Sequence, residues 1–235
     1  MPYKMVYLAR RAPTVSWEDW PRTWRSHAVF ASQFPALTGS IDWLVYATRV
    51  SDPSLGDLPV STEHDGVSIQ GAQTLGPFLG EAFTREQRAM IDEDELRVFD
   101  RYTPEFSFYC TEASLVDGPI GDAAVFRFLR RRPQVSRADF EAHLKGEYAD
   151  LCKAAADTLG AQRWTLNTTV EPPPEDFPFE MIDEFWFPTV RNAADALTAP
   201  AMQQLTASLT RVCAPEHEIT MLTRPTQIWP RSLRP

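Results

Sequence analysis

A stretch near the start of the chain recurs 120 positions later, and this repeat constrains the fold more than any other feature. Residues 5–27 read MVYLARRAPTVSWEDWPRTWRSH, and residues 125–147 read VFRFLRRRPQVSRADFEAHLKGE. Both copies place an apolar run before two arginines, followed by a proline, a serine and an aspartate. They differ at the last position, where His27 corresponds to Glu147. The repeat predicts two related halves that share one local structure.

The charge and the apolar pattern restrict the classes of partner. A formal net charge of −9 disfavours binding to a phosphate backbone, so we expect no nucleic-acid partner. No segment approaches the roughly 20 apolar residues of a membrane span, and the N-terminus lacks the pattern of a signal peptide. Cys110, Cys152 and Cys213 are far apart and form no CxxC motif. We therefore expect a cytoplasmic protein without membrane contact and without a metal site.

Hydrophobic periodicity predicts the same order of elements in both halves. We expect strands at 4–11, 40–50, 67–74, 106–116, 123–131, 162–170, 180–187 and 218–228. We expect one helix from Ser16 to Phe34, which Pro21 should either kink or make start later. Further helices are expected at 78–90, 92–99, 136–156, 191–197 and 201–212, with an extended tail at 229–235. The order strand-helix-strand-strand-helix-strand is that of a ferredoxin-like domain. The sequence therefore predicts an α+β fold of two tandem ferredoxin-like domains, 1–118 and 119–235, each covering the open face of the other's sheet.

An ordered set of residues in the first half resembles the EthD family, which belongs to the dimeric α/β barrel superfamily. The set is Arg10, Arg11, Ser16, Asp19, Trp20, Trp24, His27 and Ala28. The segments Asp65-Gly66-Val67 and 92–100 look like the third strand and the last helix of that family. The resemblance covers most of residues 4–115. It is weaker over 123–228, where Asp183-Glu184-Phe185 takes the place of Asp-Gly-Val.

The resemblance implies both a fold and a range of activities. Family members normally pair two ferredoxin-like chains, so the two halves would here form an intramolecular dimeric α/β barrel. Ligands would lie between the sheet and the helices of each half. Members are mostly cofactor-free proteins of aromatic, polyketide and hydrocarbon metabolism, and those with assigned activities include dehydratases and decarboxylases.

His27 is the leading candidate for catalysis. Helical spacing places it on the same face as Trp20 and Trp24, which should point toward the sheet. An imidazole there could act as a general base or acid near neutral pH. The alternative is a core histidine that bonds to a backbone carbonyl. Trp24, on the same face, is a candidate to bind the substrate.

Glu147 is a second catalytic candidate, because it takes the place of His27 on an apolar helix face. A buried carboxylate is costly unless it is paired or functional. Two alternatives stay open. Tyr148 could occupy the face and leave Glu147 at its edge, or Glu147 could pair with Arg127 or Arg130.

Further candidates of the first half lie on or near its strands. His64 and Asp65 stand where a loop meets a strand, which is a common position for site residues, although a solvated turn is the alternative for both. Tyr7, Trp43 and Tyr46 could line an aromatic pocket or simply pack in a core. Strand alternation predicts that Trp43 and Tyr46 face opposite sides of the sheet.

The second half offers different side chains at comparable places. Arg127 occupies the strand position of Tyr7, so we expect the two halves to have diverged and only one of them to be active. Asn167 is a polar residue in an apolar strand and could bind a ligand oxygen, or it could be a buried and satisfied amide. Trp164 and Trp186 could line a pocket, and we count Trp186 among the substrate-binding candidates.

Together with these candidate residues, the resemblance implies a cofactor-free lyase that dehydrates or decarboxylates a hydrophobic aromatic or polyketide-like molecule. The chain lacks the GxGxxG, GxxxxGK[ST], HExxH and GxSxG motifs, which disfavours nucleotide cofactors, zinc hydrolysis and the serine hydrolase fold. One alternative is a cofactor-independent monooxygenase or isomerase. Another is a non-catalytic protein that binds a small molecule or haem, with His27 or His64 as the haem ligand. A homodimer of fused barrels also stays open.

Overall fold

The strands of the chain form one closed barrel in this computed structural model, which describes residues 3–81, 83–214 and 218–229. The strand order around the barrel is β1-β3-β2-β8-β5-β7-β6-β4, and every neighbouring pair is antiparallel. The strands are β1 (Tyr3–Ala9), β2 (Trp43–Arg49), β3 (Gly66–Ala72), β4 (Ser107–Val116), β5 (Ala123–Leu129), β6 (Arg163–Thr169), β7 (Met181–Phe187) and β8 (Ile219–Trp229). Of the tail expected to be extended, residues 230–235 lie outside the described residues.

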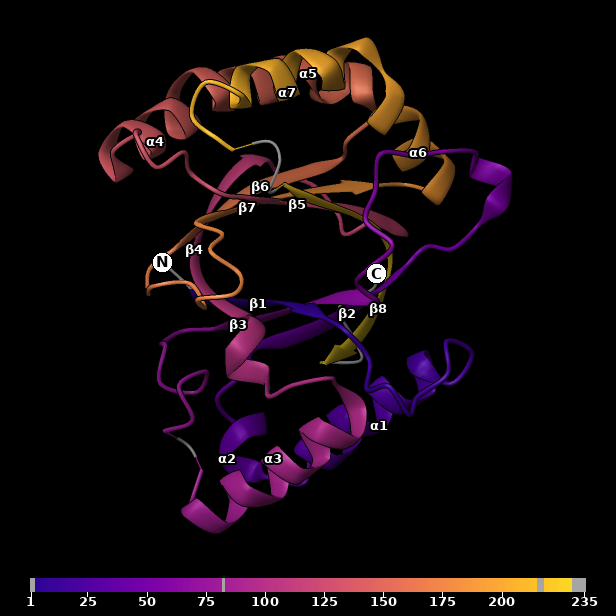
Figure 1. The fold of residues 1–235 in the computed structure, drawn as a ribbon, viewed down its shortest axis with the longest axis vertical. Helices are drawn as coiled ribbons and strands as arrows, with labels where there is room; N and C mark the ends of the chain where they lie inside the picture. Colours follow the sequence, from indigo (N-terminus) through magenta and orange to yellow (C-terminus); the bar gives the residue numbers. More distant parts are fainter. Residues whose placement is uncertain (1–2, 82, 215–217, 230–235) are drawn as a thin grey trace.

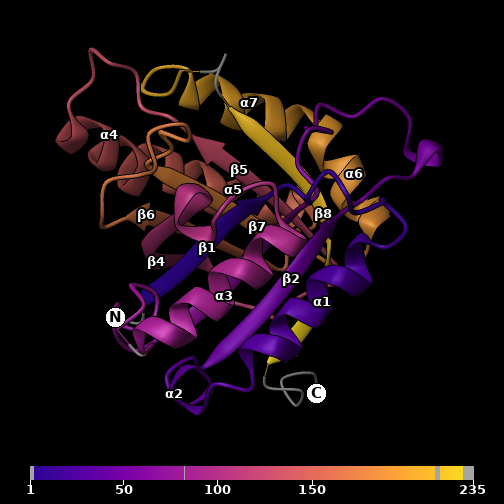
Figure 2. The same ribbon diagram turned by 60° about the horizontal axis from the view of Figure 1, so that its bottom comes forward.

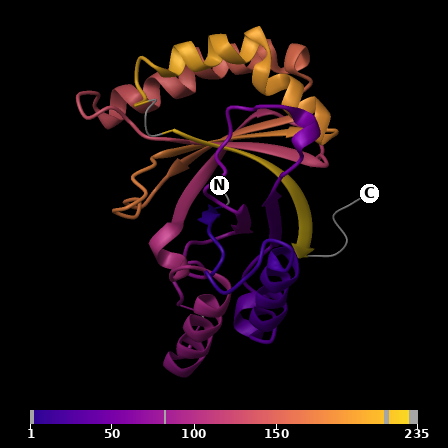
Figure 3. The same cartoon turned by 45° about the vertical axis from the view of Figure 1, so that its right-hand side comes forward.

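Two layers of helices cover opposite sides of the barrel, as Figure 1 shows. The helices are α1 (Trp20–Ala31), α2 (Pro35–Thr38), α3 (Arg85–Val98), α4 (Arg137–His143), α5 (Ala149–Leu159), α6 (Val190–Thr198) and α7 (Pro200–Leu209). In Figure 2 the first-half layer comes forward, and α1 and α3 lie side by side over the strands. Figure 3 shows the wall of the barrel curving from one layer to the other along β4 and β8. Among the described residues, no helix is both long and apolar enough to cross a membrane.

The expected fold class is corrected by this topology. We expected two tandem ferredoxin-like domains, each with a sheet of its own, in an intramolecular dimeric α/β barrel. Instead, the hydrogen-bonded ladder runs without a break through both halves, because β2 pairs with β8 and β4 pairs with β6. A four-stranded sheet would leave two edges with unpaired backbone groups, and closure removes every edge. The domain boundary at residue 118 therefore stays a prediction from the repeat.

The helices of the first half begin and end differently from the expectation. The helix α1 begins at Trp20 and not at Ser16, which is the later start that Pro21 left open. Pro21 stands in its first turn, where the missing N–H costs nothing. The helix expected at 78–90 and the short helical turn expected at 92–99 are one helix, α3, which begins only at Arg85. Thr84 caps it by accepting a hydrogen bond from the Gln87 N–H, while the Gln87 side chain accepts from the Thr84 N–H.

The long helix expected at 136–156 is interrupted by a π-helical turn over Leu144–Tyr148. Gly146 has non-helical dihedral angles there, with φ −100° and ψ −105°. A π turn inserts one extra residue into the helical repeat, so the face that each following side chain presents is shifted. Tyr148 is consequently buried, and Glu147 is exposed.

Matching ion pairs at the ends of the first strand of each half confirm the repeat and correct one of its correspondences. Arg11 pairs with Asp65, and Arg131 pairs with Glu180. Asp65 therefore corresponds to Glu180 and not to Asp183. The register agrees, because Ala9 lies opposite the residue after Asp65, and Leu129 lies opposite the residue after Glu180.

The interior of the barrel contains a buried polar network within an aromatic core. The ammonium of Lys4 lies 2.8 Å from Glu184 Oε2 and also pairs with Glu112. Asn167 Nδ2 and Trp186 Nε1 donate to Glu184 over 2.9 and 2.7 Å. Burial opposes charge on both partners, but the attraction between them prevails, raising the pKa of Lys4 and lowering that of Glu184.

Candidate active site

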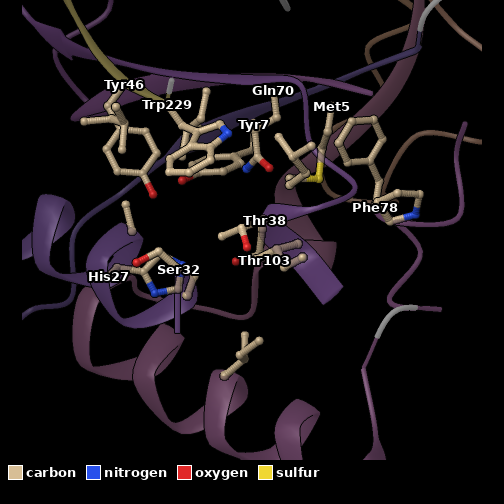
Figure 4. A pocket seen from close by; sticks show the side chains of 18 of the residues that line it. Met5, Tyr7, His27, Ser32, Thr38, Tyr46, Gln70, Phe78, Thr103 and Trp229 are labelled. Carbon is tan, nitrogen blue, oxygen red and sulfur yellow. The ribbon is translucent and has the colours of Figure 1, made fainter. Parts of the chain in front are cut away.

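A cavity of about 490 Å³ lies between the outer face of the first-half strands and helices α1, α2 and α3. Met5, Leu44 and Phe78 are among its apolar walls, and Figure 4 shows it from close by. The last residues of β8, including Trp229, complete the wall. A strand of the second half therefore contributes to the cavity of the first half.

His27 lines this cavity from α1 and is held by an aspartate of α3. The distance from His27 Nδ1 to Asp94 Oδ2 is 2.7 Å. Arg97 Nε donates to the other oxygen of Asp94 over 2.8 Å. Burial raises the pKa of Asp94, but hydrogen bonds from His27 and Arg97 outweigh it and hold that pKa below its usual range. Because a carboxylate only accepts hydrogen bonds, an ionised Asp94 requires His27 to carry a hydrogen on Nδ1.

In a neutral ring the other nitrogen of His27 therefore carries a lone pair. Nε2 has no hydrogen-bond partner in the part of the chain that the structure describes. A histidine in this tautomer, oriented by a carboxylate on its far nitrogen, is arranged to accept a proton at Nε2. The arrangement can therefore perform general-base chemistry on a molecule in the cavity.

Tyr46 and Tyr7 contribute phenols to the same cavity from β2 and β1. Trp24 Nε1 donates to the Tyr7 hydroxyl over 2.9 Å, and the Trp24 ring stacks on Tyr46 at 4.3 Å between centroids. Burial raises the pKa of Tyr7 to about 12, and burial together with the neighbouring Tyr7 raises the pKa of Tyr46 well above its usual value. Both phenols therefore keep their protons at neutral pH and can donate hydrogen bonds. Trp24 lies behind them and fixes their positions.

A buried carboxylate on α3 stabilises the wall of the cavity. Glu95 pairs with Arg88 and accepts a hydrogen bond from the backbone N–H of Thr103 over 2.8 Å. Glu95 and Arg88 both line the cavity, together with the polar side chains of Gln70 and Thr103. These groups give an otherwise apolar space a few directed hydrogen-bonding positions.

The corresponding space in the second half is filled by side chains. Tyr148 donates a short hydrogen bond to Asp183, and Trp164 Nε1 donates to the other Asp183 oxygen over 2.6 Å. The Trp164 ring packs against Phe185 at 4.6 Å between centroids. Burial raises the pKa of Asp183 to about 6, although the nearby Arg127 and the two donors lower it. The second half therefore has a packed polar core where the first half has a cavity.

His64 and Arg127 lie in a second cavity and not in the first. His64 is 2% exposed, and its pKa falls to about 4, chiefly because of burial and then because of the charges of Arg10 and Arg101. Arg127 is buried and donates to Glu218 over 2.7 Å. The structure thus separates these two candidates from His27, Tyr7 and Tyr46, which line one cavity from its helix side and its sheet side.

Glu147 and Asp65 form ion pairs away from both cavities. Glu147 lies on the surface, where Arg211 binds both of its oxygens over 2.6 and 2.7 Å. The alternative partners considered for it, Arg127 and Arg130, are therefore wrong. Asp65 is buried and accepts a hydrogen bond from the backbone N–H of Arg11 over 2.9 Å, which ties the end of β1 to the start of β3.

The remaining candidates face the interior of the barrel. Trp43 packs under the ammonium of Lys4 at 5.6 Å, whereas Tyr46 faces the helices, so the two lie on opposite sides of the sheet as alternation predicts. Asn167 and Trp186 bind Glu184 there. None of these three side chains, Trp43, Asn167 and Trp186, lines either of the two cavities described above.

Three site residues, Asp94, Glu95 and Trp229, escape sequence reasoning. The acidic run 92–95 is typical of a solvated helix end, yet Asp94 binds His27 and Glu95 is buried. The sequence did contain a signal for the burial of Glu95. Its spacing from Arg88 and Ile91 places a charged pair and an apolar side chain on one helix face. Trp229 had no such signal, because β8 reaches this cavity only through its pairing with β2. Among the described residues, no group of three or more histidines, cysteines and acidic residues could hold a metal ion.

Comparison with protein families matches residues 132–209 to the EthD domain. The expected relationship to this family is thereby confirmed for about a third of the chain. The matched segment lies in the second half, where the resemblance was weaker, and not in the half that contains His27. No curated protein sequence matches the chain.

Solved structures of similar fold extend over nearly the whole chain. A proposed monooxygenase of Fusobacterium nucleatum subsp. nucleatum is 12% identical, with a TM-score of 0.58, and the similarity covers 96% of this chain and 93% of that one. An anthrone oxidase-like protein is 9% identical, with a TM-score of 0.57 and coverages of 97% and 93%. A variant of the chlorite dismutase of Candidatus Nitrospira defluvii is 12% identical, with a TM-score of 0.53 and coverages of 97% and 92%. At these identities the similarity establishes the fold alone.

Proposed function

We propose that the chain is an enzyme that moves protons on a hydrophobic, aromatic or polyketide-like small molecule, and that its reaction is a dehydration or a decarboxylation. The observation that carries this proposal is the His27–Asp94 pair in the wall of a cavity that also holds the Tyr46 and Tyr7 phenols. Side chains of these types can carry such a lyase reaction by themselves.

For a dehydration, His27 Nε2 removes a proton from the carbon next to a carbonyl group of the substrate. The electron pair moves to the carbonyl oxygen, and the protonated Tyr46 phenol stabilises the resulting enolate by a hydrogen bond. The enolate then reforms the carbonyl group, a carbon–carbon double bond forms, and the bond to the β-hydroxyl group breaks. The imidazolium of His27 donates its new proton to this hydroxyl group, which leaves as water. Asp94 stabilises the positive charge on His27 between the two steps.

The size and walls of the cavity support an aromatic substrate. A volume of about 490 Å³ lies within the usual range of small-molecule sites, and Met5, Leu44 and Phe78 offer apolar contacts. The EthD match at residues 132–209 is consistent with small-molecule chemistry.

A second candidate function begins with the same proton transfer. If His27 removes a proton from an anthrone-like carbon, the resulting carbanion can react with molecular oxygen, as in a cofactor-independent monooxygenase. One oxygen atom then becomes the new carbonyl of the product, and the other leaves as water. The names of two structures of similar fold, a proposed monooxygenase and an anthrone oxidase-like protein, favour the inclusion of this candidate.

The test is an assay of the purified protein on a panel of polycyclic β-hydroxy ketones, aromatic carboxylic acids and anthrones, with product masses and oxygen consumption recorded. A lyase gives loss of water or carbon dioxide without oxygen uptake, and a monooxygenase consumes oxygen. His27→Ala should abolish turnover, whereas Arg22→Ala, an exposed position on the same helix, should not change it. Full turnover by a folded His27→Ala protein would disprove the proposal.

The same preparation distinguishes the two non-catalytic alternatives. A haem-binding protein would develop a Soret band on titration with haem, and the band would be lost in the His27 or His64 variant that removes the ligand. A carrier protein would bind members of the panel without converting them. Either result without turnover would replace the enzymatic assignment.

A further inference from the structure

A second cavity, of about 1030 Å³, opens at the end of the barrel where β1 and β5 end. It shares no lining residue with the cavity that contains His27. Arg10 and Arg130, which occupy the same position of the repeat, both line it, and so does His64. This cavity therefore lies between the two halves and has no part in the chemistry proposed above.

The positive charges of this cavity are balanced except for one. Three lining arginines each have a carboxylate partner: Arg10 with Glu63 at 3.3 Å, Arg101 with Asp176 at 3.2 Å, and Arg127 with Glu218 at 2.7 Å. The half-buried side chain of Arg130 has no hydrogen bond or ion pair among the described residues. The lining therefore has a net charge of one positive unit when His64 is neutral.

His64 adds an unsatisfied polar group to the same wall. Its Nδ1 lies 3.4 Å from Ser61 Oγ, while its Nε2 is buried without a partner in the described part of the chain. A buried polar atom without a partner destabilises the folded protein, because it has lost its hydrogen bonds to water. With Ser61 donating to Nδ1, Nε2 carries the hydrogen and can donate to an acceptor in the cavity. Because the pKa of His64 falls to about 4 through burial and then through Arg10 and Arg101, this donor is uncharged at neutral pH.

Apolar side chains form the rest of the lining. Phe177 lies beside His64, with 6.1 Å between ring centroids, and under the guanidinium of Arg101 at 5.3 Å. Phe179 and Met202 continue this surface. The cavity therefore offers a hydrophobic surface next to one unpaired cation and one uncharged N–H donor.

We propose that this second cavity binds a small molecule that carries a single carboxylate on a hydrophobic body. Arg130 pairs with the carboxylate, because its planar guanidinium can bind both oxygens. His64 Nε2 donates a further hydrogen bond, and the Phe177 surface covers the hydrophobic body. A monoanion fits the single unbalanced charge better than a dianion, since a dianion would leave one negative charge uncompensated in a partly buried space.

The test is calorimetric titration of the whole protein with 2-naphthoate, with 2-naphthamide as the uncharged ligand of the same shape and with inorganic phosphate as the dianionic one. We expect 2-naphthoate to bind at least tenfold more tightly than either. Arg130→Gln should weaken 2-naphthoate binding at least tenfold, and Arg130→Lys should weaken it less. Arg22→Gln, an exposed arginine of the first half, should have no effect. Because Arg130 has no partner, its replacement should leave the melting temperature unchanged.

Nitrogen NMR of the histidine rings assigns the bound ligand to one cavity. We expect 2-naphthoate to shift the His64 Nε2 signal and to leave the His27 signals in place. Equal affinity for the carboxylate and the amide, tighter binding of phosphate, unchanged affinity in Arg130→Gln, or a shift at His27 in place of His64 would each overturn the proposal. Loss of lyase or oxygenase activity would not affect it, because the two cavities share no lining residue.

Discussion

The two halves of the barrel use the same space between sheet and helices in opposite ways. In the first half Trp24 packs over Gly66, at a place where an added Cβ atom would collide with its ring, and the phenols of Tyr7 and Tyr46 face a cavity. In the second half Leu144 and Met181 hold the positions of Trp24 and Gly66, within a continuous apolar cluster. One backbone plan thus supports either a cavity or a solid core, and side-chain volume decides between them.

The helices above the sheet show a second contrast. The helix α1 is continuous and presents His27 to the cavity, whereas the π turn at Leu144–Tyr148 rotates Glu147 outward and Tyr148 inward. Because of the extra residue in the π turn, the second half has no inward-facing side chain at the position that corresponds to His27, which faces the cavity of the first half. On the function proposed above, the first half carries the chemistry and the second half supports it, and four experiments test that division.

The largest expected effect concerns the carboxylate behind His27. Asp94→Asn replaces an acceptor by an amide that can donate, which favours the wrong tautomer of His27, so we expect kcat to fall about 10²- to 10⁴-fold. Glu147→Gln, at the position of His27 in the second half, should leave kcat unchanged because Glu147 pairs with Arg211, and at 3.9 Å with His143, away from both cavities. Steady-state kinetics on the best substrate of the panel measures both. Equal losses of kcat in the two variants would contradict the assignment of catalysis to the first half alone.

The next effect is an opposite pH dependence of stability in the two halves. The first half buries His64, whose pKa is lowered to about 4. The stability that neutral His64 contributes is therefore present above pH 6.5 and is lost as the pH falls toward 4. The second half buries Asp183, whose pKa is raised to about 6. The stability that protonated Asp183 contributes is therefore present below pH 3.8 and is lost as the pH rises through 6. Each shift corresponds to about 3 kcal/mol.

These two contributions largely cancel in the native protein between pH 4 and 6.5. His64→Gln should therefore show a free energy of unfolding that falls with pH across this window, and Asp183→Asn one that rises. Urea unfolding at pH 4, 5, 6 and 7 measures the slopes. Parallel curves for the two variants and the native protein would show that neither group titrates as its burial requires.

A smaller effect distinguishes the two buried tyrosines of the helix–sheet layers. Tyr148→Phe removes a donor from Asp183 and should lower the free energy of unfolding by about 1–3 kcal/mol. Tyr46→Phe should lower it by less than about 1 kcal/mol, because its phenol faces a cavity that water can enter, but it should reduce kcat. Urea unfolding and kinetics on both variants separate the two roles. The reverse pattern would exchange the functions of the two halves.

The smallest expected effect is that of the surface ion pair in the second half. Glu147 and Arg211 are about half exposed, so a double-mutant cycle to alanine should give a coupling energy of about 0–1 kcal/mol. Urea unfolding of the two single variants and the double variant measures it. A coupling above about 2 kcal/mol would mean that this pair, and not the packed core, fixes the π turn.

Much of the local structure was predictable because both copies of the repeat can be recognised in the sequence. The paired arginines at Arg10 and Arg130 marked the ends of equivalent strands, and the strand positions followed from alternation. Closure of the barrel was not predictable, because the β2–β8 and β4–β6 pairs join segments far apart in the sequence. Asp65 was matched to the wrong residue, because the segments between strands differ in length in the two halves.

The candidate site was only partly predictable for a similar reason. His27, Tyr7 and Tyr46 could be proposed from periodicity, since each stands on an apolar face. Asp94 could not, because a carboxylate in an acidic run carries no sequence signal for the histidine that it binds from another helix. The exposure of Glu147 depended on one non-helical residue, Gly146, whose dihedral angles are not encoded in a hydrophobic pattern.

Residues 117–122 connect β4 to β5 and so make the whole barrel one polypeptide. In a barrel assembled from two copies of one chain, every mutation appears on both sides, and a change that fills one cavity also fills the other. In the single chain each position mutates once. Natural selection can then preserve a cavity on one side while substitutions accumulate freely on the opposite side, so the covalent connection itself permits asymmetry to evolve.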